Sequence, residues 1–82
     1  TAYPNPFNSS TLLRYSLKKA DFVSITVFDI NGKKIQTLVN EYQEAQNYEI
    51  RFNASDLPSG LYICTFKAGN IFTQSRRMVL LR

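Results

Sequence analysis

Hydrophobic and polar residues alternate along most of this chain with the two-residue period of a β-strand. In the first such run, Leu13, Tyr15 and Leu17 fall on one face, while Arg14 and Ser16 fall on the other. Alternation of this kind is typical of strands that bury one side only. The strands expected from the pattern are residues 11–17, 23–27 with a continuation to 30, 34–39, 48–52, 61–66 and 71–81.

Three of these runs depart from simple alternation. Residues 61–66 are apolar at both parities, which predicts a central strand covered on both sides. Strict alternation is lost near Leu38 and Val39, so we expect a bulge or a strand end there. The last run, residues 71–81, is long enough to bend or break near Arg76.

Turn-forming residues separate the runs. Asn31-Gly32 is a strong signal for a hairpin with a type I′ turn, because both central residues of that turn need positive φ. Pro58 lacks an amide donor and Gly60 permits unusual dihedral angles, so residues 53–60 read as a turn-rich connection. Residues 40–47 are polar and read as a loop, with a short helical turn over residues 41–45 as the alternative.

Six or seven short strands without a convincing helix predict an all-β fold. Turn signals at roughly 8–12-residue spacing favour an immunoglobulin-like antiparallel β-sandwich of about seven short strands. Tyr62 lies two residues before Cys64, which is the spacing of a tyrosine corner in such domains. Cys64 has no second cysteine with which to form a disulfide, so we interpret it as a small buried apolar residue.

The composition removes several classes of function. The 82 residues fit one domain, and the 44% hydrophobic and 20% charged residues are those of a globular protein. No apolar run exceeds four residues, which excludes a transmembrane helix and the core of a signal peptide within these residues. Because the chain opens at Thr1 without a methionine, we expect it to be cut from a larger polypeptide.

Histidine is absent and Cys64 is the one cysteine, so the usual general base and the usual metal ligands are missing. We therefore expect no enzyme activity, no small-molecule substrate, no metal and no cofactor. The net charge of +4 comes from ten basic residues, six of them in the pairs 18–19, 33–34 and 76–77, and the aromatic residues fall mostly at alternating, core-like positions. A nucleic-acid partner is therefore not expected.

Short motifs at both ends and in the middle of the chain carry a resemblance. They are Tyr3-Pro4-Asn5-Pro6-Phe7-Asn8 followed by Ser9-Ser10-Thr11, then residues 13–17, 27–33 and 57–62, and finally Arg76-Arg77-Met78-Val79-Leu80-Leu81-Arg82. Each motif is weak alone, but together and in this order the chain resembles the type A C-terminal sorting domain of type IX secretion. The resemblance spans essentially the whole chain.

The resemblance implies one non-catalytic domain over residues 1–82, with residues 1–10 as an extended, proline-rich lead-in. It also implies an N-terminally fused cargo that passes through the periplasm to the cell surface or the extracellular space. The implied partners are the outer-membrane translocon with its shuttle components, and a sortase-like cysteine protease that removes the domain in many members. A chain that ends at Arg82 directly after a strand suits a domain with nothing following it.

Two sets of residues are candidate sites under this interpretation, and the turn residues Asn31, Gly32, Pro58, Gly60 and Tyr62 are expected to be structural. For recognition by the translocon we expect the last strand, with Arg76, Arg77, Met78, Val79, Leu80 and Leu81, to act by strand addition at a sheet edge. For the processing border we expect Tyr3, Pro4, Asn5, Pro6, Phe7 and Asn8. The alternative function is that of an accessory immunoglobulin-like module, either flagellar-hook-assembly-like or adhesive and carbohydrate-binding, in a larger surface protein.

Overall fold

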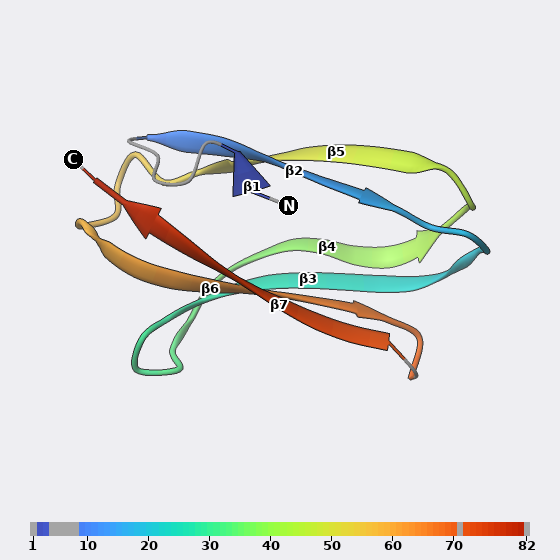
Figure 1. Ribbon diagram of the computed structural model, residues 1–82. Coiled ribbons are helices and arrows are strands. Elements are labelled where there is room, and N and C mark those ends of the chain that lie inside the picture. The colour runs from blue at the N-terminus through green and yellow to red at the C-terminus, as the bar shows by residue number, and fades with distance from the viewer. Residues whose placement is uncertain (1, 4–8, 71, 82) are drawn as a thin grey trace.

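Two antiparallel sheets pack face to face in the computed structural model, which describes residues 2–3, 9–70 and 72–81 (Figure 1). The strands are β1 (Ala2–Tyr3), β2 (Ser10–Ser16), β3 (Asp21–Asp29), β4 (Lys34–Gln43), β5 (Asn47–Asn53), β6 (Gly60–Ala68) and β7 (Phe72–Leu80). The three-stranded sheet has the order β1-β2-β5, and the four-stranded sheet has the order β4-β3-β6-β7. The predicted all-β, immunoglobulin-like sandwich is confirmed.

The number of full strands differs slightly from the expectation. Six strands are seven to ten residues long, whereas β1 has two residues. The sandwich therefore has six full strands where about seven were expected. The described residues form no helix, so none that could span a membrane is present among them.

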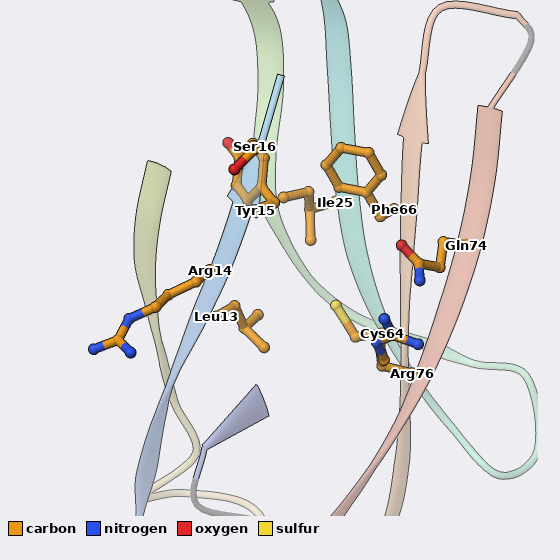
Figure 2. Close-up of a pocket in the computed structure, with 9 residues that line it drawn as sticks. All are labelled: Leu13, Arg14, Tyr15, Ser16, Ile25, Cys64, Phe66, Gln74 and Arg76. Atoms are coloured by element: carbon orange, nitrogen blue, oxygen red, sulfur yellow. The ribbon is translucent and has the colours of Figure 1, made fainter. Parts of the chain in front are cut away.

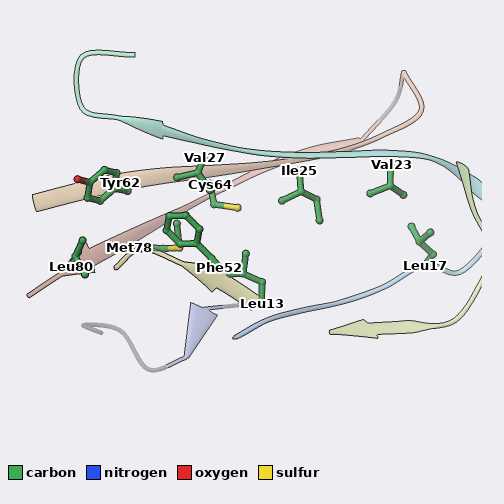
Figure 3. Close-up of a cluster of buried hydrophobic side chains, with 11 residues drawn as sticks. Leu13, Leu17, Val23, Ile25, Val27, Phe52, Tyr62, Cys64, Met78 and Leu80 are labelled. Carbon is green, nitrogen blue, oxygen red and sulfur yellow. The ribbon is translucent and has the colours of Figure 1, made fainter. Parts of the chain in front are cut away.

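The core lies between the two sheets and is formed by the inward residues of the alternating runs. Phe52 and Leu13 enter it from the three-stranded sheet, and Val23, Val27 and Met78 enter it from the four-stranded sheet (Figure 3). Phe52, Val23, Val27 and Met78 are wholly inaccessible to solvent. Burying a side chain of this size contributes about 1.5–3 kcal/mol, so these positions carry much of the stability of a small domain.

Strand β4 contains two irregularities and is longer than predicted. In its pairing with β3, Ile25 lies opposite Val39 but Thr26 lies opposite Thr37, so Leu38 is an extra residue. The bulge expected near Leu38 and Val39 is therefore present, and a second register shift leaves Ile35 as another extra residue.

The loop predicted for residues 40–47 is wrong over its first half. β4 continues to Gln43, and its pairing with β3 reaches Asp21. The polar residues of this half of the segment continue the ladder as an edge strand, where polar side chains are well tolerated. The alternative, a helical turn, is likewise absent from these described residues.

The hairpin between β3 and β4 has a different turn from the predicted type I′. Gly32 has a φ of 83°, but no described non-glycine residue has positive φ, so Asn31 does not meet the type I′ requirement. The amide of Gly32 donates to the carbonyl of Asp29, and the Asp29 carboxylate accepts from the amides of Asn31 and Lys33 at 2.9 Å each. The turn is a three-residue loop that ends in a left-handed glycine, and Asp29 satisfies its amides.

Strand β7 runs without interruption, so the expected bend or break near Arg76 does not occur. Its register with β6 is continuous from Phe72 opposite Ala68 to Leu80 opposite Gly60. The predicted strand over residues 61–66 is central in its sheet, between β3 and β7. It is covered on one face only, because the three-stranded sheet packs on one side and nothing in the described part of the chain packs on the other (Figure 1).

The start of β6 has the geometry of the predicted tyrosine corner. Tyr62 is 4% exposed, and its hydroxyl donates to the carbonyl of Pro58 at 2.8 Å. This hydrogen bond holds the connection that contains Pro58 and Gly60 against the first residues of the strand. Cys64 is buried in the core two residues later, as expected.

Tyr62→Phe is expected to lower the free energy of unfolding by about 1 kcal/mol, since it removes this partly buried hydrogen bond. Tyr48→Phe is the matched control. Its hydroxyl also donates to a carbonyl four residues earlier, that of Glu44, but in an exposed position. Urea denaturation should show a smaller loss for the control, and equal losses for the two variants would remove the special role of the corner.

A candidate recognition surface at the edge strand

Strand β7 forms one edge of the four-stranded sheet. Among the described strands it pairs with β6 alone. An edge strand is a template for another strand. The edge position agrees with the sequence-based hypothesis of strand addition.

The side chains of the predicted recognition segment divide by parity. Met78 and Leu80 are fully buried in the core, so in this fold no partner can contact their side chains. Val79 and Leu81 are 38% and 54% exposed. Arg77 is also exposed, and it lies on the same outward row as Val79.

Arg76 lies on the inward row, at the rim of a groove of about 210 Å³ between the two sheets. With the Gln74 amide oriented so that its oxygen faces the guanidinium, that oxygen accepts hydrogen bonds from Nη2 and Nη1 of Arg76 at 2.6 and 3.1 Å. The groove is open between β2 and β7, and its lining residues are Leu13, Arg14, Tyr15, Ser16, Ile25, Cys64, Phe66, Gln74 and Arg76 (Figure 2).

The groove is poor in reactive side chains. Figure 2 shows Arg14 directed away from the other lining side chains, and its Nε lies 2.7 Å from a carboxylate oxygen of Glu49 on the neighbouring strand. Burial raises the pKa of the Cys64 thiol to about 11, so this thiol is protonated and weakly nucleophilic at neutral pH. No carboxylate is among the lining residues.

The other predicted site residues do not gather near β7. Asn31 and Gly32 lie in the β3–β4 turn, and Pro58, Gly60 and Tyr62 form the corner described above. Within the proposed processing border, the backbone of Tyr3 pairs with Leu12 as part of β1. Pro4, Asn5, Pro6, Phe7 and Asn8 lie outside the described residues.

Sequence reasoning missed a row of residues on the outer face of the four-stranded sheet. Lys34 lies opposite Phe28, Phe28 opposite Ile63, and Ile63 opposite Arg77, so the four side chains cross all four strands on one face. The apolar residues at both parities of 61–66 were the signal for this row. They were interpreted as a sign of burial on both faces.

Sequence reasoning also missed a contact between the two sheets at the C-terminal end of β4. The hydroxyl of Tyr15 in β2 donates to Oε1 of Gln43 in β4 at 2.6 Å, and Nε2 of Gln43 donates to Glu41 at 3.0 Å. Burial raises the pKa of Tyr15, opposed by this hydrogen bond to Gln43. Tyr15 also stacks on Tyr48, with ring centroids 5.1 Å apart. The cluster explains how a polar residue in a predicted loop, Gln43, comes to be 7% exposed.

Comparison with known proteins adds one finding. A family model described as the secretion system C-terminal sorting domain matches residues 1–80. No curated protein and no solved structure matches the chain.

Proposed function

The chain belongs to the family of C-terminal sorting domains of type IX secretion, and from this premise we propose that the translocon reads it at the edge strand β7. A domain of this family is a sorting signal, and the protein that carries it is exported to the cell surface or the extracellular space. The proposal concerns which part of the folded signal is contacted.

The observation that supports the proposal is that β7 is an edge strand among the described strands. A partner strand can add there through main-chain hydrogen bonds, which supply affinity without unfolding the domain. The opposite edge strand, β4, carries two register shifts, and bulges of this kind disfavour pairing with another strand. The regular edge is therefore the better template of the two.

Side chains on β7, and Leu81 directly after it, provide the specificity in this proposal. Met78 and Leu80 fix the strand in the core, and Val79 and Leu81 present apolar surface to the partner. Arg77, exposed on the same row, adds a positive charge. Recognition would thus use alternate residues of the segment, in keeping with the two-residue period of a strand.

The remaining parts of the proposal follow the family. The whole chain acts as one non-catalytic domain fused to a cargo, and crosses the periplasm before shuttle components deliver it to the outer-membrane translocon. A sortase-like cysteine protease removes it at a border formed by Tyr3–Asn8. The high pKa of the Cys64 thiol supports the absence of catalysis, because it leaves the only cysteine a poor nucleophile at neutral pH.

Val79→Lys combined with Leu81→Lys tests the recognition role. The domain is fused to a periplasmic reporter in a bacterium with type IX secretion, and extracellular reporter is measured. Export is expected to fall about tenfold, because losing two exposed apolar contacts costs about 1.4 kcal/mol or more of binding free energy.

Ile30→Lys is the control, since this apolar side chain is 66% exposed in the turn between β3 and β4, neither of which pairs with β7. The control should be exported as well as the unaltered domain, and both variants should melt near its temperature. Full export of the β7 variant would rule out this edge. A translocon-null strain should export neither protein.

A further inference from the structure

The charged side chains on the outer face of the four-stranded sheet are all positive. Its outward positions follow from the register, because residues paired across antiparallel strands point to the same side and buried Val23, Ile25 and Val27 point inward. The outward residues whose side chains are described are Phe22, Ser24, Thr26, Phe28, Lys34, Thr37, Asn40, Tyr42, Leu61, Ile63, Thr65, Lys67, Ser75, Arg77 and Val79. We call this set the basic face.

The basic face carries Lys34, Lys67 and Arg77, and none of the fifteen residues just named is a carboxylate. Two acids at the ends of β3 border the face and accept hydrogen bonds from backbone amides. The Asp21 carboxylate accepts from the amide of Phe22 at 2.8 Å, and that of Asp29 holds the hairpin turn. These hydrogen bonds leave the carboxylates charged, but the three cations of the face outnumber the two acids that border it.

Apolar side chains lie between these cations. In the row from Lys34 to Arg77, the two central residues are Phe28 and Ile63, and the adjacent row places Leu61 opposite Val79. Neighbouring strands are about 4.8 Å apart, so the two terminal cations are separated by roughly 14 Å of mostly apolar surface. At the far end Phe22 and Tyr42 lie opposite each other, both exposed.

We propose that the basic face binds the headgroup region of an anionic phospholipid bilayer. Cations attract the negative surface, and partly exposed aromatic and aliphatic side chains suit the boundary between headgroups and acyl chains. The backbone groups of the two central strands, β3 and β6, are paired within the sheet, so this face can approach the boundary without leaving their amides unsatisfied. A charged sugar chain or a nucleic acid would gain less from the aliphatic pair Leu61 and Val79, which offers no ring for stacking.

The proposal does not depend on recognition at β7. It gives the domain a second contact, with the membrane in which its receptor lies, and so restricts the search for that receptor to two dimensions. Arg77 and Val79 belong to both surfaces, whereas Lys34 lies on β4 and Lys67 on β6, so substitution of these two lysines alters the basic face without changing a residue of β7.

Vesicle flotation tests the proposal, with the 82-residue chain and vesicles of phosphatidylcholine with or without phosphatidylglycerol. Binding is expected with the anionic vesicles only, and should weaken at high salt because the Debye length shortens. Lys34→Gln combined with Lys67→Gln should lower the partition coefficient on the order of 25-fold, since each basic residue near an anionic surface contributes about fivefold.

Lys18→Gln combined with Lys19→Gln is the matched control. It makes the same change in net charge at two exposed positions in the β2–β3 connection, outside the basic face. The control should retain most of the binding, and thermal melting should show that both variants are folded. An equal loss of binding in the two variants would mean that the net charge of the domain, and not the basic face, determines binding, and it would overturn the proposal. Equal binding to neutral vesicles would also overturn it.

Reporter export separates this inference from the function proposed above. The Val79→Lys, Leu81→Lys variant keeps Lys34, Lys67 and Arg77, so it should still bind anionic vesicles while failing in export. Loss of vesicle binding in that variant would contradict the assignment of charge as the main attraction. If the domain bound a single-stranded oligonucleotide but no anionic vesicles, the ligand of the basic face would be a nucleic acid and the proposal would be overturned.

Discussion

Leu80→Ala should lower the free energy of unfolding by about 2–5 kcal/mol, because it opens a cavity in the core where this side chain is fully buried. Leu81→Ala is the natural control at the next position. Its side chain is 54% exposed, and the substitution should change stability by less than about 0.5 kcal/mol. Urea denaturation followed by circular dichroism measures both.

A similar loss for the two variants would mean that the alternation of β7 is not as the structure has it. The difference also bears on how the recognition segment can be studied. Deletion of residues 76–82 removes Met78 and Leu80 from the core together with the exposed residues. Loss of export after such a deletion would therefore report unfolding as readily as loss of a contact, and substitution of outward residues is the sharper test.

Cys64 is expected to react with iodoacetamide at pH 8 at least about 100-fold more slowly in the folded domain than in denaturing urea. The reactive form is the thiolate. An ordinary thiol with pKa 9.0 is about one-tenth ionised at this pH, whereas a pKa of about 11 leaves about one molecule in a thousand ionised. Burial, the cause of the raised pKa, also restricts access of the reagent.

Mass spectrometry of samples quenched over time gives both rates. The folded-state rate should rise about tenfold per pH unit between pH 8 and 10, because the thiolate fraction rises in that proportion below the pKa. A native rate within tenfold of the denatured rate would contradict the buried, inert thiol. It would also reopen the possibility of chemistry in the groove between the sheets.

Alternation was sufficient to locate the strands whose inward residues meet the second sheet. Val23, Ile25 and Val27 in β3, and Phe52 in β5, repeat every second residue and are all buried. The tyrosine corner was predictable for a related reason, because the spacing of Tyr62 and Cys64 reflects a fixed position at the start of a strand.

The second half of β4 could not be found in this way. After the bulge at Leu38, Glu41 and Gln43 point inward and Tyr42 points outward, which inverts the usual pattern. The inversion is tolerated because the inward side of this strand end meets Tyr15, whose hydroxyl satisfies the Gln43 amide. A contact between residues 28 positions apart leaves no local signal.

The candidate surface was predictable only in part. The sequence placed Val79 and Leu81 in a terminal strand, but parity alone did not reveal which sheet edge that strand would form. The row from Lys34 to Arg77 is assembled from all four strands of one sheet, through pairings that no local pattern specifies. Membership of the family, by contrast, was evident from short motifs, because their order along the chain can be seen without knowing how the strands pair.

The irregularity of β4 limits what can happen when a strand adds to β7. Head-to-tail growth of a fibre requires two compatible edges on each molecule, one to receive and one to be received. Within the four-stranded sheet, the register shifts at Ile35 and Leu38 leave β7 as the regular one of the two edges. The irregular β4 edge thus disfavours head-to-tail growth of a filament through the two edges of this sheet.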